Sequence, residues 1–348
     1  MTDGCISHDK IRKGDRMMLK FDEQKQLNSV NGALALRGTI NDIVDQFCRE
    51  GYKNICWLGI GGTYASAMQA VVHMKERSEI ETFVENAAEY NTTGNKRVGK
   101  GTVVIVSSVS GNTVEVVAGV KKAQADGAKV IGFIDVAGAV LDELCDYTVN
   151  YAENEQLKFF MVADRFMFNN GEFEEYDRYY SELDAHLAQA LVNVSKKADD
   201  FAKDFAMKHR HDEMHYFIGA GNQFGATYSY AMCYWEEQMW LRTKSIHAAE
   251  FFHGTLEVIE ENVPVTVFVG EDSQRPLSER VVNFLPKICA NYTVIDSADY
   301  ELEGISKEFR GNLSHLVMHA VTSRIDVYIE KFNCHPLEIR RYYRRLDY

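Results

Sequence analysis

The sequence predicts an α/β protein with two doubly wound lobes, each built on a parallel sheet. Three observations support this prediction. Strand, loop and helix patterns alternate about four times over residues 54–150, the same alternation returns over 214–300, and a long charged helical pattern separates the two stretches. Strands that alternate with helices are typical of parallel sheets covered on both faces. At 348 residues, the chain also exceeds the size at which single hydrophobic cores stop growing.

Composition and charge narrow the classes of function. The formal net charge is −13, so the chain is a poor general binder of polyanions, and we expect neither nucleic acid nor a membrane as partner. No stretch of about 18 apolar residues predicts a membrane span, and the first residues are too polar for a signal peptide. The seven cysteines are scattered and form no CxxC pair, which favours buried thiols in a reducing cytoplasm.

The N-terminal region is polar at first and then helical. Residues 1–30 are mixed in character, and we expect an N-terminal arm over 1–35. Within residues 31–50, Ile40, Ile43, Val44 and Phe47 recur on one helical face, and Gly51 ends the pattern. We place the first lobe at 36–170.

The first loop of interest follows an apolar strand pattern over 54–60. Gly61, Gly62 and Thr63 turn the chain into a helical pattern rich in small residues, which allows close packing of helix on sheet. The glycines partly match the dinucleotide fingerprint, but Tyr64 stands where its third glycine belongs. We therefore expect no nicotinamide cofactor. The next elements expected are a strand at 80–84 and a short helix at 87–90.

The second loop follows the β-branched run at 103–106 and precedes a helical pattern that begins at Val114. It places the hydroxyls of Ser108, Ser110 and Thr113 at a helix N-terminus, where the first N–H groups lack partners and the dipole is positive. Such a loop predicts a site for a phosphate or another anion. The alternative is that Ser110 or Thr113 only caps the helix. A further strand at 130–134 completes this βαβ unit.

A connecting helix is expected over 171–212, because apolar residues recur at spacings of three and four from Tyr180 to Phe205. His209, His211 and His215 near its end suggest a metal site. Their spacing matches no recognised zinc pattern. Basic side chains that stabilise the negative end of a helix are the better explanation, and we predict no metal.

The second lobe is placed at 213–348. A strand at 214–218 leads into the glycine-rich loop 219–225, which is the third loop of this kind. The chain ends in a cluster of arginines over 340–345, which offers local positive charge for a phosphate or carboxylate in an acidic protein. A solvated tail is the alternative. The other elements expected are a helix at 226–241, a strand at 265–269, a helix near 277–289, a strand at 292–295 and a last helix near 312–332.

The acid–base candidates concentrate in residues 236–254. Adjacent helical residues point about 100° apart, so one of Glu236 and Glu237 can face the interior while the other faces solvent. A carboxyl in an apolar pocket has its pKa raised, which suits a general acid or base. His247 and His253 are equal candidates for proton transfer near neutral pH. The alternatives are that both glutamates are solvated and that His253 is a satisfied core histidine.

The loops together resemble the sugar isomerase (SIS) family with tandem SIS domains. The motifs that carry the resemblance are GGTYAS at 61–66, SVSGNT at 108–113, GAGNQFG at 219–225 and HAAEFFHGTLEVIE at 247–260. The chain is similar to the isomerase domain of glucosamine-6-phosphate synthase. It is more similar to the fructoselysine/glucoselysine 6-phosphate deglycases, because of AEFFHG and the ending RRYYRRLDY. The resemblance implies two flavodoxin-like lobes.

The resemblance also implies roles for individual residues. Glu237, sixteen positions before His253, would move a proton between C1 and C2 of the sugar. His253 would act as the acid at the ring oxygen or carbonyl and reach the site of a neighbouring subunit. Val109 and Thr255 depart from the family pattern, which leaves substrate details open. The residues expected to bind the phosphosugar are Thr63, Ser108, Ser110, Asn112, Thr113 and Arg341.

The function implied is a deglycase for a 6-phosphorylated conjugate of a sugar and an amino acid, an Amadori-type product. Proton transfer through an enaminol would give a Schiff base, and its hydrolysis would release hexose 6-phosphate and the amino acid. We expect no cofactor, and a homodimer or higher homo-oligomer with sites at the subunit interface. The alternatives are an aldose–ketose phosphosugar isomerase, a deaminating isomerase of the glucosamine-6-phosphate type, and a non-catalytic sugar-phosphate sensor.

Overall fold

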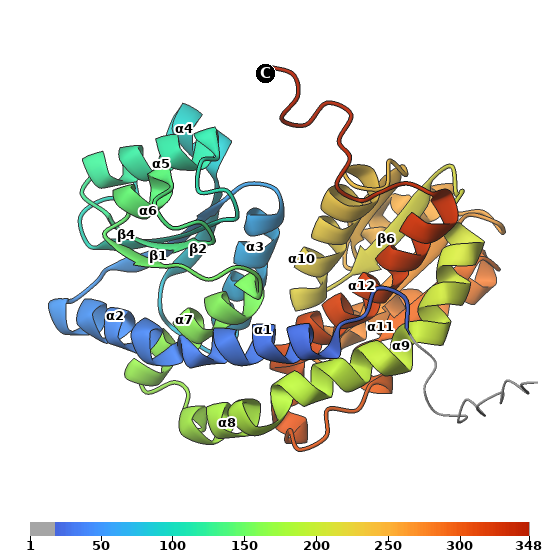
Figure 1. Cartoon of the computed structure of the whole chain (residues 1–348), viewed down its shortest axis with the longest axis horizontal. Coiled ribbons are helices and arrows are strands. Elements are labelled where there is room, and N and C mark those ends of the chain that lie inside the picture. Colours follow the sequence, from blue (N-terminus) through green and yellow to red (C-terminus); the bar gives the residue numbers. More distant parts are fainter. Residues whose placement is uncertain (1–17, 348) are drawn as a thin grey trace, which may run out of the picture.

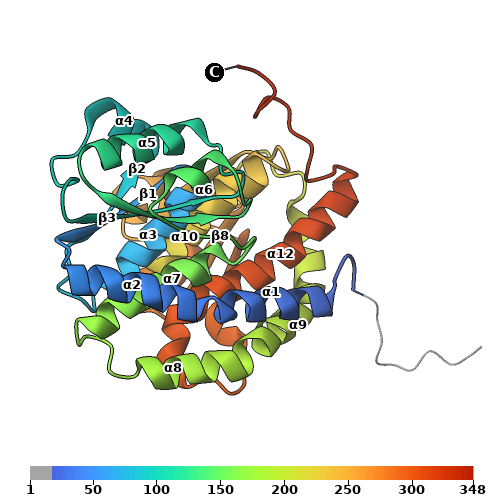
Figure 2. The same cartoon turned by 60° about the vertical axis from the view of Figure 1, so that its left-hand side comes forward.

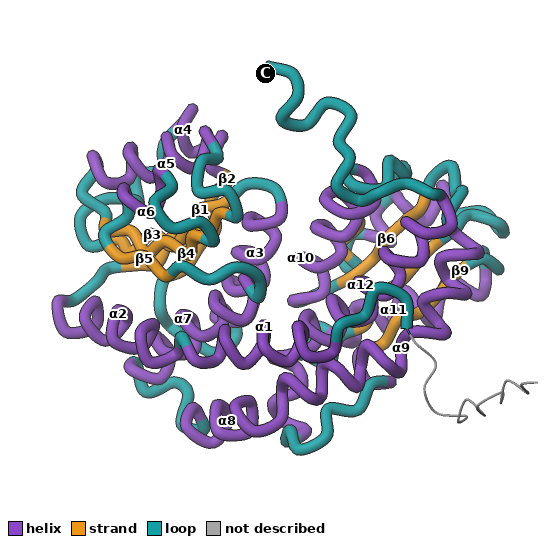
Figure 3. Tube along the Cα trace, in the orientation of Figure 1, coloured by secondary structure: helices purple, strands orange, loops and turns teal. Residues whose placement is uncertain are grey.

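The computed structural model describes residues 18–347 and arranges them as two α/β lobes joined by long helices (Figure 1). The strands of the two lobes form separate sheets (Figure 3), and both sheets are parallel throughout. The α/β fold class predicted from the sequence is therefore confirmed. Long helices at the base of the molecule hold the two sheets apart.

Lobe 1 contains a five-stranded sheet with the order β2-β1-β3-β4-β5. This is the flavodoxin-like order of a doubly wound sheet. Buried β-branched side chains fill its central strands, as in β3, where all residues are buried. Its elements are β1 Asn54–Gly59, α3 Gly62–Lys75, β2 Thr82–Asn86, α4 Ala87–Thr93, β3 Thr102–Ser108, α5 Val114–Ala125, β4 Lys129–Ile134, α6 Val140–Leu144 and β5 Tyr147–Val149.

Lobe 2 repeats this order with one strand fewer, as β7-β6-β8-β9. Strand β7 was not expected from the sequence, because its short polar pattern (TKSIH) is that of an edge strand rather than a buried one. Its elements are β6 His215–Gly219, α10 Asn222–Ser229, the π-helix η2 Tyr230–Glu236, β7 Thr243–His247, the 3₁₀ turns η3 Phe251–His253 and η4 Thr255–Val258, β8 Val265–Val269, α11 Arg275–Phe284, η5 Leu285–Lys287, β9 Tyr292–Asp296, η6 Ser297–Asp299 and η7 Lys307–Leu313.

The expected N-terminal arm is helical over its second half, while residues 1–17 lie outside the described residues. The side chain of Asp22 accepts a hydrogen bond from the Lys25 N–H and caps α1, whose apolar face is buried. The expected connecting helix begins at Tyr176 and passes through a π-helical turn. None of the helices described is long and apolar enough to cross a membrane. The helices not yet given are α1 Glu23–Ala35, α2 Arg37–Glu50, α7 Glu155–Asn169, α8 Tyr176–Glu182, η1 Leu183–Leu187, α9 Ala188–His209 and α12 Ser314–Asn333.

The lobes meet directly where α3 of lobe 1 packs against α10 of lobe 2 (Figure 2). Gly225 makes this approach possible, because a Cβ atom at this position would lie 2.7 Å from the carbonyl oxygen of Ala65. The Gln69 side chain also donates a hydrogen bond to the Asn222 carbonyl oxygen at 3.0 Å. This contact holds the carboxyl edge of the first sheet against the π-helix of the second lobe.

Candidate functional site

The first glycine loop opens directly onto the N-terminus of α3. Gly61 has a φ of +62° and occupies the N-cap position, where it has no side chain to offer. The Thr63 hydroxyl accepts a hydrogen bond from the Ile60 N–H at 3.2 Å and lies 3.1 Å from the Ile60 carbonyl oxygen. Thr63 therefore shapes the loop, and the start of α3 has no side-chain cap.

The second loop also leads into a helix that has no side-chain cap. Thr113 stands at the N-cap position of α5, yet its side chain makes no capping hydrogen bond. Its hydroxyl lies 3.4 Å from that of Ser108, which also accepts from the Gly111 N–H at 3.0 Å. The hydroxyls of Ser108 and Thr113 are thus brought together beside an uncapped helix N-terminus. This arrangement fits an anion better than a simple cap.

Asn112 and Ser110 have more local roles. The Asn112 side chain donates to the Ser110 carbonyl oxygen and accepts from the Val140 N–H at 3.2 Å. The Ser110 hydroxyl accepts from the Asn112 N–H at 3.3 Å. Asn112 therefore holds the loop against α6, while the half-buried Ser110 hydroxyl also accepts a hydrogen bond from outside the loop.

The corresponding place in lobe 2 is filled by the chain itself. The Asp272 carboxylate accepts hydrogen bonds from the Asn222 N–H at 3.0 Å and from the Gln274 N–H at 2.9 Å. A Cβ atom at Gly221 would collide with this carboxylate. Burial raises the pKa of Asp272, while the two backbone donors oppose the shift. The expected loop 219–225 is shorter than predicted, because this cap starts α10 at Asn222.

The C-terminal tail connects the two lobes at the carboxyl edge of the first sheet (Figure 1). The Arg340 guanidinium donates to the Glu237 carboxylate at 2.8 Å. Four residues later, the Arg344 guanidinium donates to the Ser110 hydroxyl at 3.2 Å. One short segment therefore touches both the hydroxyl loop and the predicted base.

Glu237 lies at the end of a π-helix rather than within the regular helix expected over 226–241. Its N–H donates to the Met232 carbonyl oxygen, five residues back, at 3.0 Å. π-Helical turns are frequent at functional sites. The sequence left open which of Glu236 and Glu237 faces the interior, and in the structure the Glu237 carboxylate is ion-paired with Arg340. Its neighbour Glu236 is exposed and accepts from the Thr243 hydroxyl at 2.8 Å.

A second carboxyl at this edge, Glu155, was not recognised in the sequence. Glu155 is the first residue of α7, after two non-glycine residues with positive φ, Glu153 and Asn154. Burial raises its pKa, and the hydroxyls of Ser107 and Ser66 oppose the shift. Strained backbone next to a perturbed carboxyl is typical of functional sites. No sequence motif identifies this residue.

Cys233 lies between the two carboxyls and the first loop. Burial raises the pKa of its thiol to about 11, and the charges of Glu237 and Glu155 add to the shift. A Cβ atom at Gly62 would lie 3.7 Å from its sulfur atom. The loop at 61–63, Glu155 and Glu237 therefore surround one region between the lobes.

The structure separates His253 from this region within one chain. His253 is exposed on η3, and its backbone N–H donates a hydrogen bond to the Glu250 carbonyl oxygen at 3.0 Å. The ring of His247 accepts from the Ala249 N–H at 3.1 Å, and burial lowers its pKa. His247 is thus engaged locally, whereas His253 is free to reach another molecule.

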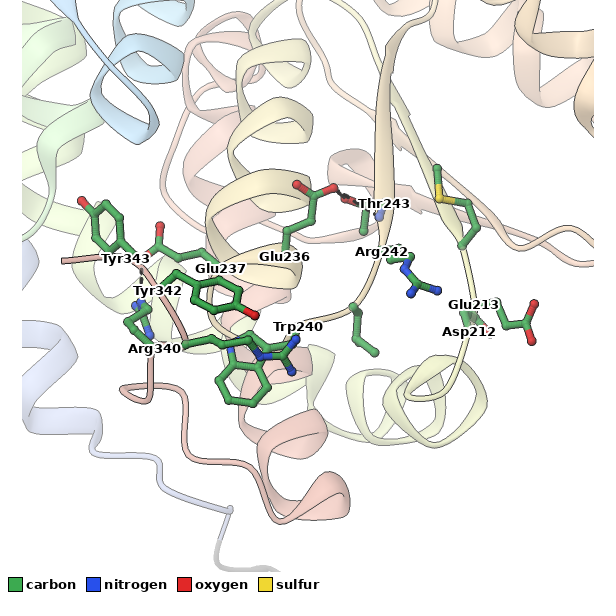
Figure 4. A pocket seen from close by; sticks show the side chains of 13 residues that line it. Asp212, Glu213, Glu236, Glu237, Trp240, Arg242, Thr243, Arg340, Tyr342 and Tyr343 are labelled. Carbon is green, nitrogen blue, oxygen red and sulfur yellow. Dashed lines mark hydrogen bonds and ion pairs between the residues drawn. The ribbon is translucent and has the colours of Figure 1, made fainter. Parts of the chain in front are cut away.

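Arg341 lies next to Trp240 in the wall of a cavity beside Glu237. Its guanidinium stacks over the Trp240 ring at 4.3 Å, and both residues line a cavity that also includes Glu237 (Figure 4). Trp240 follows the turn after the π-helix with a φ of +59°, and its ring packs against His335 near the start of the tail. Of the tail arginines, Arg341 was expected at the phosphosugar. Arg344 instead touches the hydroxyl loop.

The histidines at the end of α9 form a cluster around a carboxylate. Asp212 accepts from the ring nitrogens of His209 at 2.7 Å and His215 at 2.8 Å, and His211 takes no part in the cluster. Burial lowers the pKa of His215 to about 4. Two imidazoles that contact one carboxylate explain the cluster as a structural network. It is also the one group among residues 18–347 with the spacing to hold a metal ion.

Residues 51–164 match the SIS domain family. The chain is 31% identical over 310 residues to the fructosamine deglycase FrlB of Bacillus subtilis, a match that covers 85% of this chain and 92% of the relative. It is 23% identical to the fructoselysine 6-phosphate deglycase of Escherichia coli, covering 87% and 89%. A crystal structure from Bacillus subtilis, described as that of a phosphosugar isomerase, superimposes with a TM-score of 0.83 at 26% identity, covering 93% and 100%.

Proposed function

Because the chain belongs to the SIS-domain family of phosphosugar deglycases and isomerases, we propose that it is a deglycase for 6-phosphorylated conjugates of a sugar and an amino acid. The family predicted from the sequence motifs is confirmed, and the chain is an enzyme of this family. The proposed products are hexose 6-phosphate and the free amino acid. The observation that carries the proposal is the tail segment 340–344, which links a hydroxyl-lined anion loop to the carboxylate of Glu237.

The phosphate is proposed to bind between the N-termini of α3 and α5. Neither helix has a side-chain cap, and the hydroxyls of Ser108 and Thr113 lie beside the second one. Lobe 2 supports this placement, because there a carboxylate occupies the equivalent space between two helix starts. Uncapped N–H groups and the positive end of the helix dipole favour an anion without a net positive protein.

Glu237 is proposed to be the base. In a ketose conjugate the amine is bonded to C1, and the carboxylate removes a proton from C1 to give an enaminol. Return of the proton to C2 gives a Schiff base between C1 and the nitrogen. Water then adds to C1, the C1–N bond breaks, and the amine leaves with a proton. The C2 carbonyl oxygen accepts the electron pair from C1 and takes up a proton, and the nitrogen lone pair then forms the C1=N bond as C2 is protonated, so the scheme uses no cofactor.

His253 is proposed to serve the site of a second subunit. Its exposure on η3 leaves it available to another molecule. Several exposed apolar side chains surround the hydroxyl loop, which supports a subunit contact at this rim. These side chains are Val109, Val114, Val136 and Val140. A homodimer built in this way would complete each site with an imidazole that can donate a proton to the ring oxygen.

The test is a direct assay of the purified protein. It is incubated with fructoselysine 6-phosphate and, separately, with glucoselysine 6-phosphate, and hexose 6-phosphate and free lysine are measured. Equal amounts of both products from either conjugate support the deglycase. Conversion of a simple aldose phosphate to a ketose phosphate, without amine release from any conjugate, would assign the isomerase instead.

A further inference from the structure

A large cavity opens beside Glu237, lined by residues of lobe 2 and the C-terminal tail (Figure 4). Its volume is about 860 Å³, which is ample for an amino acid side chain and its head group. Three segments line it: the loop before β6, the end of η2 with the start of β7, and the C-terminal tail. Glu237 lies in its wall, so the cavity is continuous with the proposed site of proton transfer.

The lining carries charges of both signs. Arg341 and Arg242 line the cavity, and within residues 18–347 neither has an ion-pair partner. Glu236 and Glu213 line the same cavity. The Glu236 carboxylate keeps an oxygen beyond the one that accepts from Thr243. Separate positive and negative groups in one cavity fit a zwitterion better than a purely anionic or purely apolar ligand.

The aromatic side chains add a surface for an alkyl chain. Trp240, Tyr342 and Tyr343 line the cavity (Figure 4), and the Trp240 ring already stacks under the Arg341 guanidinium at 4.3 Å. Stacking fixes the planar guanidinium, so less entropy is lost when it binds a carboxylate in a two-pronged manner. Arg341 is therefore better placed for a carboxylate in this cavity than for the phosphate loop.

We propose that this cavity binds the amino acid moiety of the conjugate, with the α-carboxylate on Arg341 and the α-ammonium near Glu236 and Glu213. The inference rests on the proposed deglycase function. The leaving amine is bonded to C1, the carbon that Glu237 serves, so the amino acid must begin within contact of Glu237. With the phosphate in lobe 1, the chain beyond the nitrogen runs into the cavity. The substrate class is accordingly a conjugate of a zwitterionic amino acid rather than of a simple amine.

The test compares two conjugates that differ only in the head group. These are the 6-phosphofructosyl conjugates of the lysine side-chain nitrogen and of n-pentylamine, which lacks the zwitterion. Binding is measured by calorimetry in the Glu237→Gln background, so that turnover does not interfere. We expect the lysine conjugate to bind at least tenfold more tightly. Adding Arg341→Gln should weaken the lysine conjugate by about 10- to 100-fold and the pentylamine conjugate by less than twofold.

Arg49→Gln is the matched control, because Arg49 is exposed at the end of α2, outside the cavity. It should change neither affinity. Equal affinity of the two conjugates, or an equal loss on both in the Arg341 variant, would overturn the inference. The assay of product release from the unmodified protein is read separately. Absence of release from either conjugate would reject the deglycase function, while the binding difference would still decide the cavity's role.

Discussion

In lobe 2, the Asp272 carboxylate joins the start of α10 to the turn before α11 through the N–H groups of Asn222 and Gln274. In lobe 1, the starts of α3 and α5 have no side-chain cap, and two hydroxyls lie next to them. The two sheets have the same strand order around these loops. In lobe 2 the Asp272 carboxylate occupies the space beside the helix starts, and we propose that the substrate phosphate occupies the corresponding space in lobe 1.

This difference suggests a division of labour between the lobes. With its own anion site occupied, lobe 2 contributes other groups to the shared region: Glu237 at the end of η2, and the tail that follows α12. Lobe 1 contributes the open loops and the carboxyl of Glu155. We propose that the duplicated fold yields one composite site, in which lobe 1 binds the phosphate and lobe 2 carries the base.

The largest effect is expected from Glu237→Gln. The amide cannot accept the C1 proton, and loss of a general base lowers kcat by about 10² to 10⁴-fold. Because the substitution is nearly isosteric and the amide oxygen still accepts from Arg340, the thermal midpoint should change little. Steady-state assay of lysine release from fructoselysine 6-phosphate measures the effect.

Glu303→Gln is the control for this prediction, since Glu303 is exposed in lobe 2 and lies outside the cavity beside Glu237. Its kcat should stay within about threefold of the unmodified value. If the two variants lose activity equally, lobe 2 does not supply the base through Glu237, and the division of labour fails.

A smaller effect is expected at the open loop of lobe 1. Thr113→Val keeps the shape of the side chain but removes the hydroxyl, which makes no capping bond in the structure. Loss of one hydrogen bond to a charged phosphate costs about 1.5–3 kcal/mol, so KM should rise by roughly 10- to 100-fold with kcat less affected. Ser273→Ala, in the corresponding loop of lobe 2, should leave KM unchanged. A rise in KM for both variants would show that the loops of the two lobes do not differ in their contribution to phosphate binding.

Local elements of this comparison were predictable from the sequence, because their causes are local. The β-branched run of β3, the turn before α5 and the glycine turn before α3 are each specified within a few residues. The acid–base candidates Glu237 and His253 come from one contiguous stretch of the sequence, and their roles stay predictions. These features fix the lobes and the two loops.

The features that join the lobes were not predictable. Asp272 caps a helix fifty residues earlier, and Arg344 meets Ser110 across most of the chain. Such partners depend on tertiary packing, and no periodic pattern in the sequence indicates which residues will meet. The π-helix was also missed. Its backbone hydrogen bonds span five residues instead of four, and no residue type in the sequence distinguishes the two patterns.

The next prediction concerns a buried carboxyl beneath the π-helix of lobe 2. Asp326 on α12 accepts from the Tyr230 hydroxyl at 2.9 Å, and burial raises its pKa to about 8. The folded state therefore holds a proton that the unfolded state releases near pH 4. The protonated Asp326 carboxyl therefore contributes to the free energy of unfolding at low pH, and this contribution is lost as pH rises through about 8. Between pH 6 and 8 the expected loss is about 2 kcal/mol.

Chemical unfolding of the unmodified protein and of Asp326→Asn at pH 6 and 8 measures this effect. The amide cannot ionise and can still accept from Tyr230, so its stability should lack that part of the pH dependence. Parallel pH profiles for the two proteins would mean that Asp326 does not couple α12 to η2 in this way.

The smallest effect tests whether the Asp272 carboxylate stands in for a bound anion. Asp272→Ala should destabilise the protein by about 1–3 kcal/mol, because buried backbone donors at two helix starts lose their acceptor. The emptied space should then accept inorganic phosphate, so phosphate should raise the thermal midpoint of this variant more than that of the unmodified protein. Asp272→Asn keeps one acceptor oxygen and should gain less from phosphate. An equal response in all three proteins would make Asp272 a structural cap alone. The corresponding space in lobe 2 would then give no support for anion binding at the open loops of lobe 1.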